Sequence, residues 1–201
     1  MISKVENTVE MVTYEEFCAL VPDGQKADLI DGVVYMASPD SMHANKINLF
    51  IAYLVEGYIG AKGISGEVRL SRAACRLTRF NAPEPDVMYV RPERTHLIEF
   101  GQLNGAPDIA VEIVARESRD RDYTKKRDLY EAAGVTEYWI IDPLQQRCEF
   151  LRLVSGKYET AALDQGHIFH SSVIPGFWID VDWLLAEKVP VAYECQSLLL
   201  N

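Results

Sequence analysis

Apolar residues recur at helical spacing across residues 41–62, where they lie three or four positions apart. They are Ile47, Phe50, Ile51, Leu54, Val55, Tyr58 and Ile59. This spacing predicts an amphipathic helix with one buried face, and Gly63 is a residue suited to its left-handed end. A second helix is expected over residues 118–133, stopped by Gly134.

Strand-forming runs are interleaved with these helices. Runs rich in β-branched and aromatic residues predict strands near residues 66–78, 86–91, 108–115 and 137–142. Asp31-Gly32 lies between two short apolar runs and predicts a hairpin, because this dipeptide adopts the tight turn that hairpins need. A second hairpin is expected to turn at Ser155-Gly156.

Two short helices complete the predicted elements. Thr13 and Glu16 fit a capping box, so a helix is expected to start there and to turn Phe17 and Leu20 inward. Another short helix is expected near residues 182–186.

The order of the elements predicts an α/β (α+β) fold built on a mixed sheet with flanking helices. A right-handed helical crossover would set the strand at 137–142 parallel to the strand at 108–115. The chain has 201 residues, 48% of them hydrophobic, which is enough for one domain with a substantial core. We therefore expect a single domain over residues 1–201, with the second hairpin as a C-terminal extension.

Charge is unevenly placed along the chain. The net charge of −10 argues against a protein that coats nucleic acid, because such binding relies on Lys and Arg. Residues 66–127 nevertheless hold 12 of the 20 Lys and Arg. This segment also carries the candidate site described below, although a basic run such as residues 116–127 is equally typical of a solvated helix face.

The cellular setting is expected to be the cytoplasm. No run approaches the roughly 20 apolar residues that cross a bilayer, and the first seven residues contain no apolar signal core. The four cysteines are dispersed, without a pair spaced for zinc or a disulfide framework. We expect them to be reduced and no membrane to be involved.

Glu112 is the most informative residue, because it interrupts a run that otherwise fits a fully buried strand, residues 107–114. An ionised carboxylate there costs several kcal/mol, in order of magnitude, unless a cation or hydrogen-bond donors replace its water. Since side chains alternate along a strand, Glu112 faces away from Ile109, Val111 and Ile113. The sequence therefore predicts a cation beside Glu112.

Two segments could meet this carboxylate. Asp86 begins the preceding strand, and if that strand is antiparallel to the strand of Glu112, both carboxylates can converge on one Mg²⁺, which favours oxygen ligands. Lys126 shares a helix face with Asp122 and Tyr130 and could reach the pair. A lysine and two carboxylates of this kind are what metal-dependent phosphodiester cleavage requires.

Each assignment has a structural alternative. Asp108 rivals Asp86 as a ligand, but it lies roughly 13 Å along the strand from Glu112, and aspartate after proline commonly forms a turn. Lys126 could instead form a surface ion pair with Asp122. His43 is more typical of a hydrogen-bonding residue at a helix start than of a ligand.

Several motifs resemble the Uma-two family of restriction endonuclease-like proteins, a branch of the PD-(D/E)XK nuclease superfamily. They lie at residues 84–86, 107–112, 122–126 and 129–143, and the last block is the most specific. The resemblance extends from near Tyr14 to about Ile179. It implies a restriction-endonuclease-like core, a mixed sheet flanked by helices.

By this resemblance, Asp86 matches the aspartate of the superfamily motif and Glu112 its second acidic ligand. Val114 stands where the usual lysine would be, and the family pattern takes that lysine from the next helix, at Lys126. Asp28 occupies a position where the family commonly has glutamate.

One further position matches the family and one segment departs from it. His43 matches a histidine before the first long helix. The family's Ser-Pro-Ser after the glutamate strand is replaced by residues 115–117, Ala-Arg-Glu.

The resemblance implies an endonuclease that uses Mg²⁺ or Mn²⁺ to hydrolyse DNA. Asp86, Glu112 and the Ile113 carbonyl would hold the metal, Lys126 would orient water, and Asp28 would assist a second ion. A homodimer is expected by analogy with enzymes that cut both strands. Two alternatives stay open: an inactive nuclease-fold module that binds DNA, and an oligomeric interaction protein. The net charge favours these alternatives, whereas the retained Asp86, Glu112 and Lys126 favour an enzyme.

Overall fold

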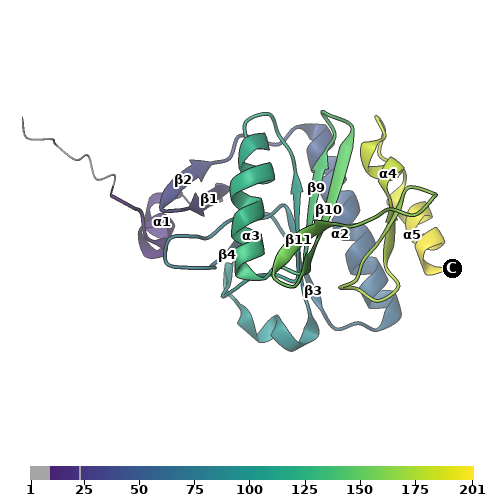
Figure 1. The fold of residues 1–201 in the computed structure, drawn as a ribbon, viewed down its shortest axis with the longest axis horizontal. Coiled ribbons are helices and arrows are strands. Elements are labelled where there is room, and N and C mark those ends of the chain that lie inside the picture. The colour runs from purple at the N-terminus through teal and green to yellow at the C-terminus, as the bar shows by residue number, and fades with distance from the viewer. Residues whose placement is uncertain (1–9, 23) are drawn as a thin grey trace, which may run out of the picture.

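The computed structural model describes residues 10–22 and 24–201, and Figure 1 shows their arrangement. The first seven residues, on which part of the cytoplasmic prediction rests, lie outside the described residues. In the described part of the chain, every helix is too short or too polar to cross a bilayer.

A mixed sheet of six strands, counted over the described residues, forms the centre of the fold, with the order β11-β10-β9-β8-β5-β3. Its strands are β3 (Glu67–Leu70), β5 (Val87–Val90), β8 (Ile109–Ile113), β9 (Glu137–Asp142), β10 (Arg147–Val154) and β11 (Lys157–Thr160). Strands β8 and β9 are parallel, whereas the other neighbours are antiparallel. The predicted α/β fold with a mixed sheet is therefore confirmed.

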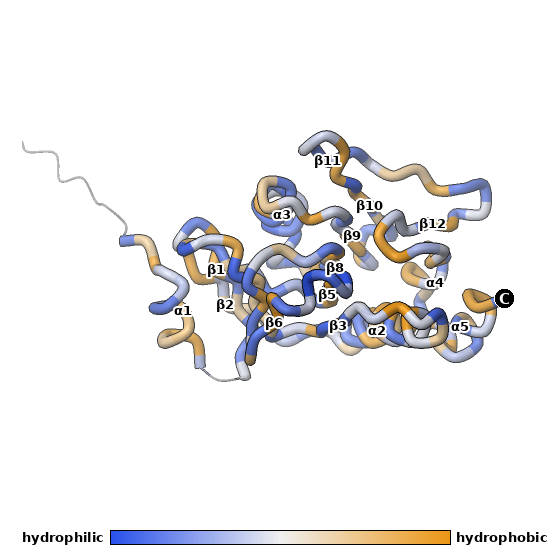
Figure 2. Tube along the Cα trace, turned by 90° about the horizontal axis from the view of Figure 1, so that it is seen from below, coloured by the Kyte–Doolittle hydropathy of each residue, from blue (hydrophilic) through white to orange (hydrophobic). Residues whose placement is uncertain are grey.

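Helices cover both faces of this sheet. Ile109, Val111 and Ile113 of β8 pack with α2 (Met42–Lys62) and α5 (Ala192–Leu200) in the larger hydrophobic cluster. Ala110 and Val114, which point the other way, pack with Tyr130 of α3 (Arg127–Ala133). Figure 2 shows α3 on one side of β8 and β9, with α2 and α5 on the other.

The two long predicted helices form, one of them with a difference. Helix α2 begins after Ser41, whose side chain accepts from the Ala44 N–H, and ends at Gly63 with φ +68°. The second helix starts with a π-helical turn, η2 (Arg121–Lys126), before α3 continues to Gly134. A wide π turn leaves no mark in hydrophobic periodicity, and such turns are frequent at functional sites.

Both predicted hairpins are present. Strands β1 (Ala27–Ile30) and β2 (Val33–Met36) form a separate two-stranded sheet, with Asp31 and Gly32 at φ +50° and +71°. The hairpin of β10 and β11 turns at Ser155-Gly156 and extends the main sheet. Turn chemistry in the sequence was therefore sufficient to locate these loops.

The shorter elements connect and cap the sheet. They are α1 (Tyr14–Leu20), β4 (Ala74–Cys75), η1 (Pro92–Leu97), β6 (Ile98–Glu99), β7 (Gln102–Leu103), β12 (Ile168–His170), β13 (Trp178–Asp180) and α4 (Val181–Leu185). Helix α1 has the predicted capping box and buries Phe17, but Leu20 is 63% exposed, so its inward placement was wrong. The small cluster under α1 centres on Tyr14 and Phe17, and the last turn of the helix extends beyond it.

Gly176 determines how closely the C-terminal segment approaches α2. Its φ is +77°, and a Cβ at this position would lie 2.6 Å from the Tyr58 hydroxyl. Tyr58 is buried in α2 and donates a hydrogen bond to the Pro175 carbonyl at 3.0 Å. An alanine here would be strained by its backbone and would displace this hydroxyl.

We expect Gly176→Ala to lower the free energy of unfolding by about 2–4 kcal/mol. The left-handed backbone costs an alanine about 1–2 kcal/mol, and the displaced Tyr58 hydrogen bond adds a similar amount. Gly63→Ala is the matched control, since φ is +68° and no atom lies within 4 Å of the added Cβ, so only the backbone cost applies. Urea unfolding measures both variants, and equal losses would contradict the close packing at Gly176.

Candidate active site

A cavity of about 440 Å³ opens at the carboxyl ends of the parallel strands β8 and β9. Crevices at this edge of an α/β sheet commonly bind ligands. The charged side chains in its wall are Lys26, Asp28, Asp40, Asp86, Glu112, Arg116, Glu117, Arg121, Asp122 and Lys126. The structure thus brings Asp28, Asp86, Glu112, Ile113 and Lys126, all identified from sequence, to one cavity.

Glu112 is 2% exposed, and its carboxylate has two donors from the following helix. Its Oε1 accepts from Lys126 Nζ at 2.8 Å and from the Tyr130 hydroxyl at 3.0 Å. Burial raises the pKa of Glu112 to about 8, although the Lys126 ammonium acts in the opposite direction. The cation that the sequence required beside this carboxylate is Lys126.

Lys126 is itself 2% exposed and lies among three carboxylates. Its Nζ is 2.8 Å from Glu112 Oε1, 3.0 Å from Asp28 Oδ2 and 3.9 Å from Asp122 Oδ1. Burial opposes the charged form, but Asp28, Glu112 and Asp122 together hold the pKa of Lys126 well above its ordinary value. The alternative of a surface ion pair with Asp122 is wrong, because both side chains are buried and Asp122 is the most distant of the three carboxylates.

Asp86 lies on the same face of the sheet as Glu112. Val87 pairs with Val111 in the antiparallel ladder, and both valines pack in the α2 cluster. Asp86 precedes the first valine and Glu112 follows the second, so alternation turns both carboxylates away from that cluster. Asp86 Oδ2 accepts from the Ile113 N–H at 2.7 Å, which ties the aspartate to β8.

Asp28 projects from β1, in the separate hairpin, and is 3% exposed. Its Oδ1 accepts from the Glu84 N–H at 2.9 Å, and its Oδ2 faces Lys126 Nζ at 3.0 Å and Arg121 Nε at 3.3 Å. Burial favours its neutral form, yet the attraction of Lys126 and Lys26 brings the pKa of Asp28 below its ordinary value. Asp28 is therefore ionised and holds Lys126 and Arg121 in place.

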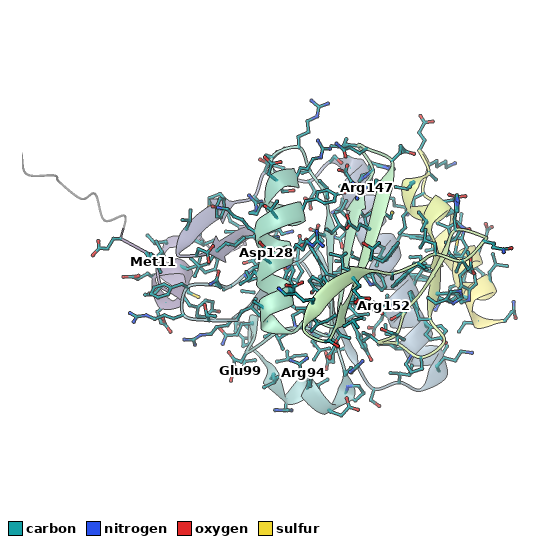
Figure 3. All side chains as sticks on the ribbon, viewed as in Figure 1. Met11, Arg94, Glu99, Asp128, Arg147 and Arg152 are labelled. Atoms are coloured by element: carbon teal, nitrogen blue, oxygen red, sulfur yellow. The ribbon has the colours of Figure 1, made fainter. Side chains whose placement is uncertain are left out.

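Asp108 lies at the opposite end of β8 from Glu112 and does not line the cavity. Its carboxylate accepts from the Arg91 N–H at 2.8 Å and pairs with Arg94 Nη1 at 3.1 Å. In Figure 3, Arg94, the partner of Asp108, lies apart from Arg147, which begins β10 just after the carboxyl end of β9. Asp108 therefore binds Arg91 and Arg94 at the far end of β8, away from the cavity that Glu112 lines.

Sequence reasoning missed two cations of the site, Lys26 and Arg121. Lys26 Nζ lies 2.5 Å from Asp86 Oδ1, and Arg121 contacts Asp28 while its guanidinium stacks over the Tyr35 ring. The available signal for Lys26 was its spacing of two residues from Asp28, which puts both on one face of a strand. Arg121 had no comparable signal, because the π turn that orients it is not visible in the sequence.

The donors present suit a hard divalent cation. Asp86, Glu112 and the Ile113 carbonyl offer oxygens, and Asp122 Oδ1 is buried without a hydrogen-bond partner. Mg²⁺ usually takes one or two carboxylates and completes its octahedron with water and phosphate. Within residues 10–22 and 24–201, no group of three or more His, Cys, Asp or Glu side chains is arranged to hold a metal ion.

Comparison with known proteins adds a family and a fold. The sequence matches the profile of the Uma2 family, described as "Putative restriction endonuclease", over residues 12–182. The structure is similar to the crystal structure of "a putative nuclease belonging to DUF820" from Anabaena variabilis, with a TM-score of 0.72 and 19% identity over 87% of this chain and 98% of that chain. No protein with a curated description matches.

We expect Glu112→Gln to stabilise the metal-free protein at high pH. Folding raises the pKa of Glu112 from 4.5 to about 8, so the folded state holds this proton more tightly than the unfolded state. The stability contributed by the protonated carboxyl is present below pH 4.5 and is lost as the pH rises towards 8. Glutamine is always neutral and keeps a similar shape.

Urea unfolding in EDTA measures this effect. The variant should equal the wild type near pH 4.5 and exceed it near pH 8 by a difference on the order of 4 kcal/mol. Glu159→Gln, at an exposed position, is the control and should show no such dependence. A Glu112→Gln protein that is less stable than the wild type at pH 8 would refute the unfavourable burial of this charge.

Proposed function

The chain belongs to the Uma2 family of restriction endonuclease-like proteins, and we propose that it hydrolyses phosphodiester bonds of DNA with Mg²⁺ or Mn²⁺. One observation carries the proposal. Asp86 and Glu112 lie on one face of two adjacent strands, beside a lysine that is buried and charged. This combination supports cleavage of a phosphate ester more directly than any binding role.

The proposed metal ligands are the Asp86 and Glu112 carboxylates and the Ile113 carbonyl. Mg²⁺ bound there would polarise the phosphate and lower the pKa of a coordinated water. For the protein, a bound cation would also compensate the burial of Glu112, whose pKa is raised to about 8 without one. The site would then bind metal most strongly where Glu112 is ionised.

Lys126 is proposed to hold the attacking water and to offset negative charge that develops on the phosphate. Its ammonium has three donors, and a fixed cation in a site with little water stabilises such charge strongly. Asp28 was expected to assist a second ion, but both of its oxygens already accept or pair with protein groups. We therefore assign Asp28 to positioning Lys126.

DNA would be contacted mainly through its phosphates. Arg116 and Arg121 line the cavity, within the segment that holds most of the basic residues. Phosphate contacts fix the position of a protein on DNA without reading its sequence. Binding without cleavage is the second candidate function, and the observation that favours it is the pairing of Asp86 with Lys26.

Three alanine variants test the proposal. Asp86→Ala should lose both metal binding and cleavage, because it removes a ligand. Lys126→Ala should bind metal almost normally and cleave about 10²–10³ times more slowly, the usual cost of removing one preorganised electrostatic group. Cleavage of linear and supercoiled DNA with Mg²⁺ and Mn²⁺, together with metal titration, measures these effects.

Lys125→Ala supplies the matched control. Its ammonium donates to the Tyr35 hydroxyl at 2.6 Å on the exposed side of η2. Only DNA affinity and its salt dependence should change in this variant. Loss of cleavage in Lys125→Ala but not in Lys126→Ala would show that the assignment of Lys126 as the catalytic lysine is wrong. A wild-type protein that binds DNA but does not cleave it would contradict the proposed hydrolysis and support binding without cleavage.

We also propose a homodimer, because each chain carries one site and double-strand cleavage requires two. Symmetric dimers are the commonest way of pairing identical subunits. Light scattering at micromolar concentration should give the mass of two chains. A monomer under these conditions would argue against paired cleavage and for nicking of single strands.

A further inference from the structure

Lys26 is a second lysine in the wall of the cavity, and the proposed reaction gives it no role. It directly precedes β1 and is only partly buried, because its side chain is 17% exposed whereas that of Lys126 is 2% exposed. Burial lowers the pKa of Lys26, but Asp86 and Glu112 outweigh this effect and raise it above the ordinary value. Lys26 is therefore a charged group at the edge of the cavity.

Its ammonium pairs with a proposed metal ligand, Asp86. Asp86 Oδ2 accepts from the Ile113 N–H, whereas Oδ1 has no backbone donor and faces the two side chains, Lys26 and Ser71. Lys26 Nζ lies 2.5 Å from this Oδ1, and the Ser71 hydroxyl is 3.4 Å away. Two cations on one carboxylate oxygen would repel each other at close range. A divalent ion can use Asp86 Oδ1 only if the ammonium leaves.

The surroundings allow the side chain to leave while its backbone stays fixed. The Lys26 carbonyl accepts from the Ala37 N–H at 3.0 Å, across the base of the β1–β2 hairpin. The side chain lies in the wall of the cavity, so a change of rotamer moves its ammonium into the space where a substrate phosphate would be bound. A lysine ammonium is a compact charge on a flexible stem, which suits such an exchange.

We propose that Lys26 is a displaceable internal cation: it holds Asp86 in the metal-free protein and transfers to a DNA phosphate when a divalent ion takes its place. The proposal rests on the proposed function, because it needs both the ion and the phosphate. Metal binding would release Lys26 to contact a phosphate, and a bound phosphate would draw the ammonium away from Asp86. Each ligand would therefore raise the affinity of the protein for the other. Lys26 would then be a positioning residue that determines when the site binds metal.

Lys26→Met tests the exchange, because methionine keeps an unbranched stem without the charge. Calorimetric titration with Ca²⁺, which takes oxygen ligands as Mg²⁺ does, should give about tenfold tighter binding to the variant in the absence of DNA. A short DNA duplex should raise the Ca²⁺ affinity of the wild type several-fold more than that of Lys26→Met. A merely structural lysine would not produce tighter metal binding on removal.

Two further variants make the outcome decisive. Lys26→Arg keeps the charge and should retain the weaker metal affinity of the wild type, and Lys125→Met removes a charge outside the cavity and should leave Ca²⁺ affinity unchanged. If Lys26→Met is less stable, Ca²⁺ should raise its melting temperature more than that of the wild type.

The possible results separate this inference from the proposed function. If the wild type binds metal and Lys26→Met binds it with equal or lower affinity, the exchange alone would be overturned. Absence of Ca²⁺ and Mn²⁺ binding in all variants would overturn both proposals. Binding by Lys26→Met but not by the wild type would support the exchange, with the lysine as the dominant competitor.

Discussion

The ion pair between Glu112 and Lys126 places the strongest constraint on this structure. Both residues are 2% exposed, and the lysine ammonium faces Asp28 as well as Glu112, so the lysine stays charged while burial raises the pKa of Glu112. The pair requires β8 to present a carboxylate away from the α2 cluster, and it requires the crossover to β9 to begin with a turn that brings a lysine back over the sheet. Tyr130 donates to the same Glu112 oxygen as Lys126, and Asp28 Oδ2 lies 3.0 Å from the lysine ammonium. The arrangement of the central strands and of η2 follows from this need.

Much of the fold could be predicted because it is encoded locally. Helix α2 follows from the spacing of its apolar residues, and both hairpins follow from dipeptides that favour left-handed backbone. The parallel pairing of β8 and β9 follows from the handedness of crossovers. Leu20 and the π turn were not predictable, because they depend on how far a neighbouring cluster extends and on burial of charge rather than on periodicity.

The candidate site divides in the same way. Glu112 was visible as a charge within an apolar strand, and Asp86 and Lys126 followed from strand order and helix spacing as well as from family motifs. Lys26 and Arg121 were missed, since each is defined by a partner that is distant in sequence. The cavity wall has the same sign as the overall charge of −10, because six carboxylates line it with four cations, Lys26, Arg116, Arg121 and Lys126.

The β1–β2 hairpin is not part of the main sheet, yet it supplies Asp28 and the residue before it supplies Lys26. Lys26 is separated from Asp86 by 60 residues, and Asp28 from Glu84 by 56. Contacts between distant segments close large loops and are slow to form during folding. A chain still being synthesised therefore lacks a complete site until the strands, η2 and the hairpin have come together. An enzyme of this design would acquire its activity only after these distant segments have packed together.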